Sequence, residues 1–216
     1  MRIDEYAWSV RIRDPEMSNA EREESLTLEM LEAIDASSDV TQRNLAQRMN
    51  VALGLANSYL KRCVGKGWVK IHQAPANRYL YYLTPTGFTE KGRLTGRYLT
   101  NSLDFYRKAG ESCRESIRFC RRRRWNRIVL CGVSELAEIA SLRAIEHDVR
   151  IAAVLDPAVE STRFLNRVVM RSLTACEPFD VCLVTDMKNP VVTRDRLLAE
   201  TDASRIVVPS ILGLFS

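Results

Sequence analysis

Histidine is scarce in this sequence, and long apolar runs are missing. Only His72 and His147 occur in 216 residues, and no segment approaches the roughly 20 apolar residues that a membrane-spanning helix needs. The charged N-terminus, MRIDEYAWSVRIRD, is not typical of a secretory signal. No CxxC pair and no Cys/His spacing typical of zinc is present. We therefore expect a cytoplasmic protein that binds neither a membrane nor a metal.

The cysteines predict free thiols in a reducing compartment. They are Cys63, Cys113, Cys120, Cys131, Cys176 and Cys182. Redox sensing by Cys113 and Cys120, which are seven residues apart on a predicted helix near several arginines, is the alternative. No nucleophile has a positioned base and no carboxylate pair can be placed, so we expect no catalytic residue.

Acidic residues are absent from residues 51–73 and nearly absent from a wider segment. Residues 41–100 hold ten Lys and Arg but a single acid, Glu90. The two parts of the chain also differ: residues 1–126 carry 22 basic and 15 acidic residues, whereas residues 127–216 carry 10 and 12. A basic field this concentrated attracts a polyanion, and nucleic acid is the commonest one. A solvated basic face is the alternative interpretation.

Three helices and a hairpin are predicted in this basic part. Ser18 and Glu21 form a capping box before a helix over residues 19–36, and Thr41 caps a second short helix. A turn at Asn50 and Val51 leads to a third helix over residues 52–65. Apolar residues recur at helical spacing: Leu28, Leu31 and Ile34, then Leu45 and Met49, then Ala56, Leu60 and Val64. The segments WVKIHQ and RYLYYLT, joined by APAN, alternate as two strands of a hairpin wing.

This helix-turn-helix predicts a DNA contact through the third helix. Small outward residues let its N-terminal half approach base edges, where Asn57 can hydrogen-bond a base, while its basic residues contact phosphates. The hairpin tip is expected to contact the minor groove or the backbone. The predicted DNA-binding residues are Thr41, Gln42, Arg43, Gly54, Asn57, Ser58, Lys61, Arg62, Lys66, Asn77 and Arg78.

The same region resembles a known family. The segments NLAQRMNVALGLANSYLKRC and KGWVKIHQAPANRYLYYLTPTGFTEKGRLTGRYL are similar to MarR-like winged helix regulators, most closely the branch associated with bacterial exopolysaccharide gene clusters. The resemblance covers about residues 20–107, and the passage LTPTGFTEKGRLT is its most specific part. It implies a winged helix that binds double-stranded DNA.

A long helix is predicted over residues 85–123. Its seam has heptad spacing and consists of Leu99, Leu103, Tyr106, Gly110, Cys113, Ile117 and Cys120. We expect a homodimer through residues 99–120, because a dimer presents two recognition helices to two half-sites. Packing on the chain's own domains is the alternative. The arginine run over residues 121–124 stabilises the helix dipole, contacts DNA or is a solvated junction.

The C-terminal part alternates strands and helices. Strands are predicted at RIVLCG, RIAAVLD, DVCLVTD and RIVVPSI, with a helix at SELAEIASLRAIEH. This order indicates a mostly parallel, doubly wound sheet, in which ligands bind at the carboxyl ends of the strands. The predicted ligand-binding residues are Gly132, Val133, Ser134, Glu135, Asp156 and Thr185.

The identity of this ligand stays open. The loop CGVSELAE lacks the GxGxxG fingerprint, which makes NAD the less favoured ligand, although Asp156 is placed to bind a ribose hydroxyl. Over residues 126–210, the LDP ending and FDVCLVTDMKNP resemble the Rossmann-type domain that precedes sugar acyltransferases and binds nucleotide-sugars. Ser134 at a helix N-terminus favours a phosphate, whereas Glu135 favours a neutral or amine-bearing ligand. A domain that only packs or dimerises is the alternative.

The sequence thus predicts an α+β winged helix joined by a long helix to an α/β Rossmann-like domain. The expected division is an N-terminal arm over residues 1–19, the winged helix over 20–84, the long helix over 85–124 and a sensor over 125–216. This layout also resembles redox-sensing repressors that join a winged helix to an NADH-binding Rossmann domain, although this sequence lacks their glycine fingerprint. We expect a transcriptional regulator with a nucleotide or nucleotide-sugar effector. The alternatives are an enzyme or accessory protein of nucleotide-sugar metabolism with a recruiting winged helix, and a scaffold without DNA contact.

Overall fold

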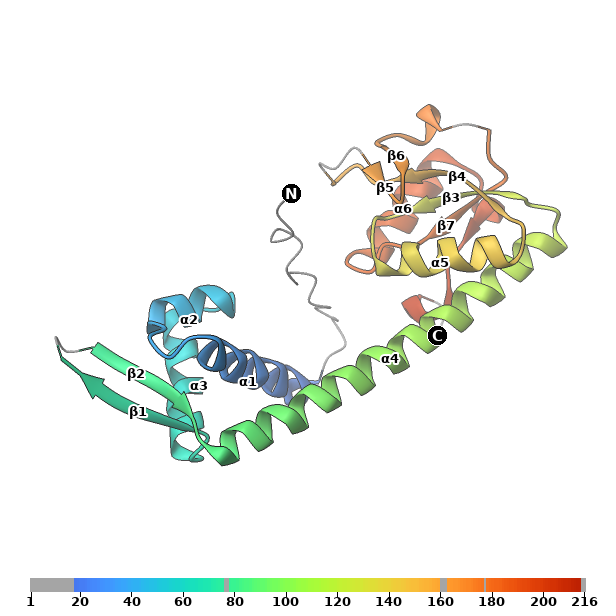
Figure 1. The fold of residues 1–216 in the computed structure, drawn as a ribbon. Helices are drawn as coiled ribbons and strands as arrows, with labels where there is room; N and C mark the ends of the chain where they lie inside the picture. Colours follow the sequence, from blue (N-terminus) through green and yellow to red (C-terminus); the bar gives the residue numbers. More distant parts are fainter. Residues whose placement is uncertain (1–17, 76–77, 160–162, 177, 215–216) are drawn as a thin grey trace. The chain divides into compact units, whose positions relative to one another are not determined.

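The chain divides into two compact units. The computed structural model describes residues 18–75, 78–159, 163–176 and 178–214 (Figure 1). The division between the units falls within the long helix α4 (Pro85–Arg122), between Ser102 and Leu103. Residues 1–17 of the expected N-terminal arm lie outside the described residues.

The first unit holds three helices and a hairpin. Its elements are α1 (Asn19–Ala36), α2 (Gln42–Arg48), α3 (Leu53–Gly65), β1 (Val69–Ala74) and β2 (Arg78–Leu83), followed by the first part of α4. The predicted caps are present: Ser18 and Glu21 form the capping box of α1, and Thr41 Oγ1 accepts a hydrogen bond from the N–H of Asn44. The strands are antiparallel, with Val69 opposite Leu83. The core includes Met30, Leu31, Leu45, Ala56, Leu60 and Cys63, so Cys63 is more deeply buried than the predicted Val64.

The turn between α2 and α3 closes as the sequence predicts. Asn50 adopts the left-handed conformation, with φ 49°, and its N–H donates to the carbonyl of Gln47. The N–H of Val51 donates to the carbonyl of Ala46, which completes a helix-ending motif. Val51 then packs against the core of the unit and fixes the direction in which α3 begins.

The start of α4 is locked to the base of the hairpin. Thr84 Oγ1 donates to the carbonyl of Gly67 at 2.6 Å and accepts the N–H of Gly87 at 3.0 Å. A Cβ atom on Gly87 would lie 2.0 Å from the carbonyl oxygen of Trp68, so only glycine permits this approach. These contacts give the passage TPTG its physical role.

The second unit is built on a six-stranded sheet. Its strands are β3 (Arg127–Cys131), β4 (Arg150–Leu155), β5 (Arg163–Phe164), β6 (Arg167–Met170), β7 (Val181–Val184) and β8 (Ile206–Val207), in the order β5-β6-β4-β3-β7-β8. All neighbouring pairs are parallel except β5 and β6. The helices are α5 (Glu135–Glu146) and α6 (Pro190–Glu200), with 3-10 turns at Leu173–Ala175, Ala203–Arg205 and Ser210–Leu212. The chain leaves β3 toward β4 and β6, then returns to β7 on its other side.

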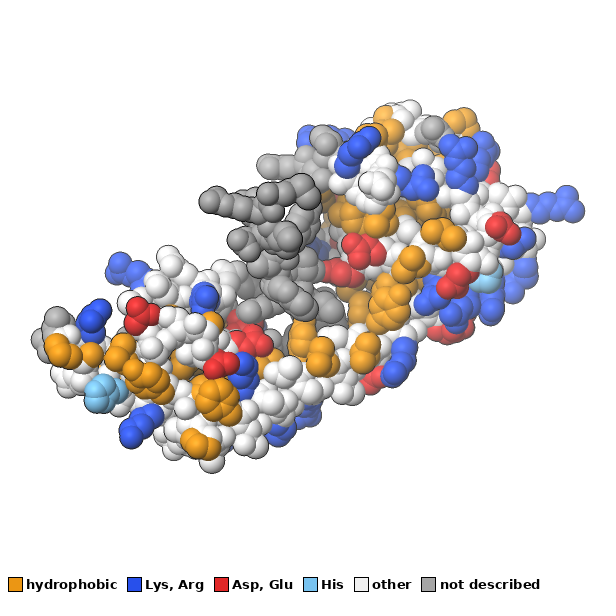
Figure 2. All heavy atoms as spheres, in the orientation of Figure 1, with side chains coloured by type: hydrophobic (Ala, Val, Ile, Leu, Met, Phe, Trp, Pro, Cys, Tyr) orange, Lys and Arg blue, Asp and Glu red, His pale blue; other side chains and the backbone are white. Residues whose placement is uncertain are grey.

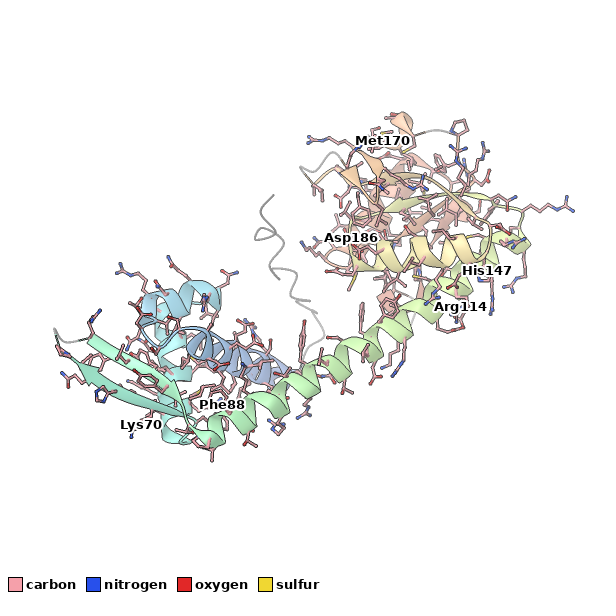
Figure 3. All side chains as sticks on the ribbon, in the orientation of Figure 1. Lys70, Phe88, Arg114, His147, Met170 and Asp186 are labelled. Carbon is pink, nitrogen blue, oxygen red and sulfur yellow. The ribbon has the colours of Figure 1, made fainter. Side chains whose placement is uncertain are left out.

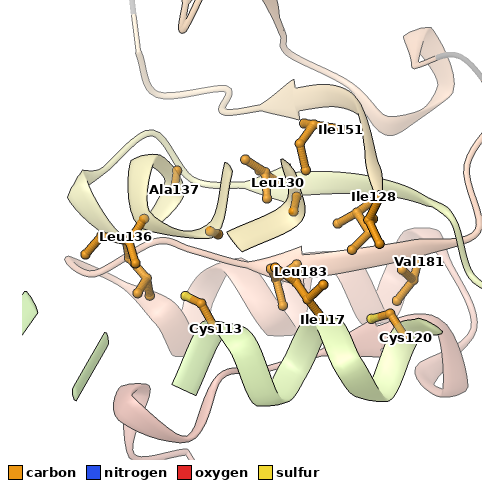
Figure 4. Close-up of a cluster of buried hydrophobic side chains, with 14 of the residues drawn as sticks. Cys113, Ile117, Cys120, Ile128, Leu130, Leu136, Ala137, Ile151, Val181 and Leu183 are labelled. Carbon is orange, nitrogen blue, oxygen red and sulfur yellow. The ribbon is translucent and has the colours of Figure 1, made fainter. Parts of the chain in front are cut away.

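Helices cover both faces of this sheet. On one face, α5 and the C-terminal part of α4 pack against side chains of β3, β4 and β7 (Figure 4). On the other face, Leu197 of α6 and Leu173 pack against Val129, Cys182 and Val184. The described helices include none that is long and apolar enough to cross a membrane.

The seam of α4 is exposed in its first part and buried in its second part. Cys113, Ile117 and Cys120 are 0% exposed and belong to the core of the second unit. The prediction that all of residues 99–120 contact a second chain is therefore wrong for this part, because the sheet of the same chain covers it. A Cβ atom at Gly110 would lie 3.1 Å from the guanidinium of Arg143 on α5, so a larger residue there would require a small shift of the Arg143 side chain.

Candidate nucleic-acid interface

Helix α3 presents an open face at its N-terminal half. Gly54, Ser58 and Lys61 are exposed, whereas Ala56 and Leu60 are buried. No atom lies within 4 Å of a Cβ placed on Gly54. The first turn of α3 has no side-chain cap and no acidic residue. Its N–H groups and positive dipole end are therefore open to an anion.

Two predicted DNA-binding residues of α3 are not fully available to a ligand. Ser58 Oγ donates to the carbonyl of Gly54 at 3.0 Å. Asn57 is half-buried, and its Oδ1 atom is covered and has no hydrogen-bond partner among the described residues. The sequence predicted that the carboxamide of Asn57 points outward, whereas the structure covers its oxygen atom.

Acids of α1 neutralise part of the basic segment. Glu23 forms an ion pair with Arg62, and Asp35 forms one with Lys91 at 2.5 Å. Glu24 pairs with Arg97 at 2.7 Å and approaches Arg93 at 3.5 Å. Arg93 also hydrogen-bonds Glu90, and this bond lowers the pKa of the Glu90 carboxyl. Arg62, predicted to contact phosphate, is thus turned toward α1.

Most of the remaining basic side chains form an open basic set; Arg48 is left out because its guanidinium donates to the carbonyl of Ala33 on α1. We give this name to Arg43, Lys61, Lys66, Lys70 and Arg78, which are exposed and make no ion pair with a described residue. They come from α2, α3 and both strands of the hairpin. The Lys66 ammonium lies 5.2 Å from the centre of the Trp68 ring, which holds it near the end of α3.

Lys70 is a member of this set that the sequence prediction missed. The hairpin register places Lys70 opposite Tyr82 and Ala74 opposite Arg78, so Lys70 and Arg78 share one face of the hairpin. Figure 3 labels Lys70 on β1. The alternation of β1 could have identified Lys70 from the sequence, because residues 70, 72 and 74 of a strand lie on the same face.

The other predicted contacts have mixed positions. The Thr41 hydroxyl serves as the cap of α2, and Gln42 Nε2 lies 3.5 Å from the Tyr81 hydroxyl. Arg43 extends from the first turn of α2 and is exposed. Asn77 lies outside the described residues.

The structure brings the six predicted ligand-binding residues of the second unit together. Gly132, Val133, Ser134 and Glu135 follow β3 at the start of α5, Asp156 follows β4, and Thr185 follows β7. Gly132 has φ 112°, and a Cβ atom there would lie 2.4 Å from the N–H nitrogen of Asp186. The predicted tight turn is therefore present, and glycine is required in it.

Most polar groups at this edge bond to one another. Asp156 Oδ2 accepts the N–H of Val133 at 2.8 Å, and Ser134 Oγ donates to the carbonyl of Thr185 at 2.5 Å. Thr185 Oγ1 donates to the carbonyl of Gly132 at 2.7 Å. Thus the Asp156 carboxylate occupies the loop N–H that a ligand phosphate would use. No cluster that could hold a metal occurs among the described His, Cys, Asp and Glu side chains.

The thiols are not arranged for redox sensing. Burial raises the pKa of Cys113 and of Cys120 to about 12, although Arg143 and Arg123 act in the opposite direction. Reactive cysteines need a lowered pKa and access to solvent. The alternative of redox sensing by this pair is therefore not supported.

Comparison with known families identifies a winged helix-turn-helix in the first unit. Residues 24–70 match the family model described as winged helix-turn-helix DNA-binding. This segment runs from α1 through α3 to the start of the hairpin. Residues 24–70, together with β2, therefore form a winged helix-turn-helix domain. A search of curated proteins found no match.

Two solved structures are similar over larger parts of the chain. One is described as the crystal structure of Streptococcus pneumoniae FabT in complex with DNA; it is 21% identical, covers 43% of this chain and 61% of its own, and has a TM-score of 0.31. The other is described as PigF with SAH, at 12% identity, 88% and 56% coverage and a TM-score of 0.24. The chain spans less than two thirds of either structure.

Proposed function

We propose that the chain is a sequence-specific, DNA-binding transcriptional regulator and not an enzyme. The observation that supports this most is the open basic set on α2, α3 and the hairpin, none of whose members forms an ion pair with a described acid, together with the uncapped start of α3. In this proposal α3 enters the major groove of double-stranded DNA, and Arg78 on the hairpin contacts the backbone or the minor groove.

The exposed part of α3 suggests what it reads. Leu53 and Leu55 are exposed beside Gly54, so they can make apolar contact with thymine methyl groups. The Ser58 hydroxyl, whose proton is donated to the Gly54 carbonyl, can accept a hydrogen bond from a base. Lys61, Lys66 and Arg43 then contact phosphates and set the register of the helix. The resemblance to regulators of exopolysaccharide clusters makes promoters of such clusters the first operators to test.

A homodimer is part of the proposal, through a shorter surface than residues 99–120. Leu99, Leu103 and Tyr106 are 53%, 55% and 42% exposed on α4, at heptad spacing. An apolar helical stripe of this kind favours pairing with the same stripe of a second copy, which would give a two-fold symmetric operator.

Fluorescence anisotropy with labelled promoter fragments tests the proposal. The chain should bind one fragment far more tightly than a scrambled duplex, and the affinity should fall steeply with salt. Lys61→Ala should weaken binding, whereas Arg97→Ala, which removes a basic residue already paired with Glu24, should have a smaller effect. Equal affinity for specific and scrambled duplexes would contradict sequence-specific regulation.

A second candidate role belongs to the C-terminal unit as a sensor. The strand order β6-β4-β3-β7-β8, with its reversal beside β3, supports a Rossmann-like domain with a binding edge at Gly132, Asp156 and Thr185. A nucleotide or nucleotide-sugar would have to displace the Asp156 carboxylate from Val133, and NAD is the less favoured ligand. Native mass spectrometry of the purified chain tests for a retained ligand. Turnover of a nucleotide-sugar would instead support the enzyme alternative.

A further inference from the structure

An arginine cluster ends α4 in the second unit, outside the winged helix. Arg118, Arg121, Arg122, Arg123 and Arg124 are exposed, and none pairs with an acid in the described part of the chain. Basic side chains gather around this end of α4 in the space-filling view (Figure 2). The neighbouring Arg127 differs, because it is paired with Asp180 at 3.0 Å.

Arg124 occupies a backbone position that normally selects glycine. Its φ is 60°, in the left-handed region. The N–H of Arg124 donates to the carbonyl of Arg121, and the N–H of Trp125 donates to that of Cys120, which is the helix-ending motif that usually has glycine at this residue. A side chain here is strained, so the presence of arginine suggests a use for its charge.

Arg123 is held by two aromatic rings. Its guanidinium carbon lies 4.8 Å from the Phe119 ring centre and 5.1 Å from the Trp125 ring centre. The two rings meet edge to face at 6.1 Å. This packing fixes one guanidinium in the middle of the cluster and occupies ring faces on which an unpaired base would otherwise stack.

We propose that this arginine cluster binds the phosphate backbone of duplex DNA as a second contact, separate from α3 and the hairpin. Five guanidinium groups within seven residues match a partner with closely repeated negative charges, and arginine binds phosphate through paired N–H groups. Because the aromatic rings hold Arg123, a double-stranded partner fits better than a single strand. The contact is independent of base sequence, and it relies on the proposed function only to bring the chain to DNA.

The test measures binding of the full chain to a mixed-sequence duplex over a range of salt concentrations. The cluster variant is Arg121→Ala with Arg122→Ala and Arg124→Gly. A matched control, Arg167→Ala with Arg171→Ala and Lys188→Ala, removes the same charge elsewhere in the unit. We expect the cluster variant to lower the slope of log affinity against log salt by about 2 to 3, because each lost phosphate contact removes roughly 0.9. The control should leave the slope nearly unchanged.

Two further arms separate this proposal from the winged-helix proposal. Arg43→Ala with Lys61→Ala and Lys70→Ala should abolish preference for a promoter fragment while the cluster still contributes to mixed-sequence binding. Arg124→Gly alone should keep or raise the thermal midpoint yet weaken DNA binding, which excludes unfolding as the cause. An unchanged salt slope in the cluster variant would overturn the second contact and leave the winged-helix contact intact. Loss of binding to phosphatidylserine vesicles, with DNA binding unchanged, would also overturn it.

Discussion

Arg62 of α3 is ion-paired with Glu23 of α1 and does not point away from the protein with Lys61. The two basic residues are adjacent in sequence and similar in charge, yet one lies against an acidic helix and the other is open to a ligand. The guanidinium of Arg62 also lies 5.7 Å from the centre of the Tyr59 ring. The proposed DNA-binding surface is therefore smaller than the basic sequence segment.

This difference predicts unequal effects on DNA binding. Lys61→Ala should lower the salt slope by about 0.9 and weaken binding severalfold, whereas Arg62→Ala should change both only slightly. Glu23→Gln should strengthen binding, by up to about 1 kcal/mol, because it releases the Arg62 charge from an exposed pair. Anisotropy titrations at several salt concentrations measure all three. A larger loss for Arg62→Ala than for Lys61→Ala would contradict this assignment.

Two glycines of α4 should respond in opposite directions to alanine. Gly87→Ala places a Cβ atom 2.0 Å from the Trp68 carbonyl oxygen and should cost about 1–3 kcal/mol or more of unfolding free energy. Gly92→Ala meets no atom within 4 Å and should stabilise the helix by roughly 0.5–1 kcal/mol. Urea unfolding followed by circular dichroism compares them. Equal midpoints for the two variants would show that the close approach at Gly87 is absent.

The two parts of the α4 seam should separate oligomerisation from stability. Leu99→Glu with Leu103→Glu changes exposed residues, so it should weaken the dimer and leave the secondary structure unchanged. Ile117→Ala removes buried side-chain volume and should cost about 2–5 kcal/mol. Sedimentation velocity reports the first effect and thermal unfolding the second. A sedimentation coefficient unaffected by the double change would rule out this stripe as the dimer contact.

Buried thiols predict a pH dependence above neutrality. Burial raises the pKa of Cys113 and Cys120 from 9.0 to about 12, so both stay protonated in the folded chain when the unfolded chain ionises. Their contribution to stability is complete below pH 9 and is lost as pH rises toward 12. Neither thiol should react with iodoacetamide at pH 8 until the chain unfolds, as peptide mass spectrometry can measure. Rapid labelling of Cys113 in the native chain would contradict its burial.

Local elements could be predicted because their signals lie within a few residues of one another. The capping box of Ser18 and Glu21, the turn at Asn50 and the alternation of the hairpin strands are short-range patterns, and each is present. The parallel sheet followed from alternating strand and helix segments. Strands β5 and β6 and helix α6 were not predicted individually, since the strands are two and four residues long and carry weak patterns.

The candidate site could be located from the sequence, but its members could not be chosen. Composition identified the basic segment and the third helix. It gave no means of predicting that Glu23, Glu24 and Asp35 would reach across to Arg62, Arg97 and Lys91. Similarly, the sequence predicted that the polar residues would meet at the sheet edge. It did not predict that the Asp156 carboxylate would accept a hydrogen bond from the N–H of Val133.

By itself, the sequence determined the helix-turn-helix, the hairpin, the long helix and four of the six strands of the second unit, because periodicity and capping are set by neighbouring residues. Tertiary structure alone decided what each face meets. The spacing of Leu103 and Ile117 places both on one stripe of α4, yet Leu103 is open and Ile117 is covered by the sheet. Burial and ion pairing depend on elements far away in sequence, and a helical repeat carries no information about them.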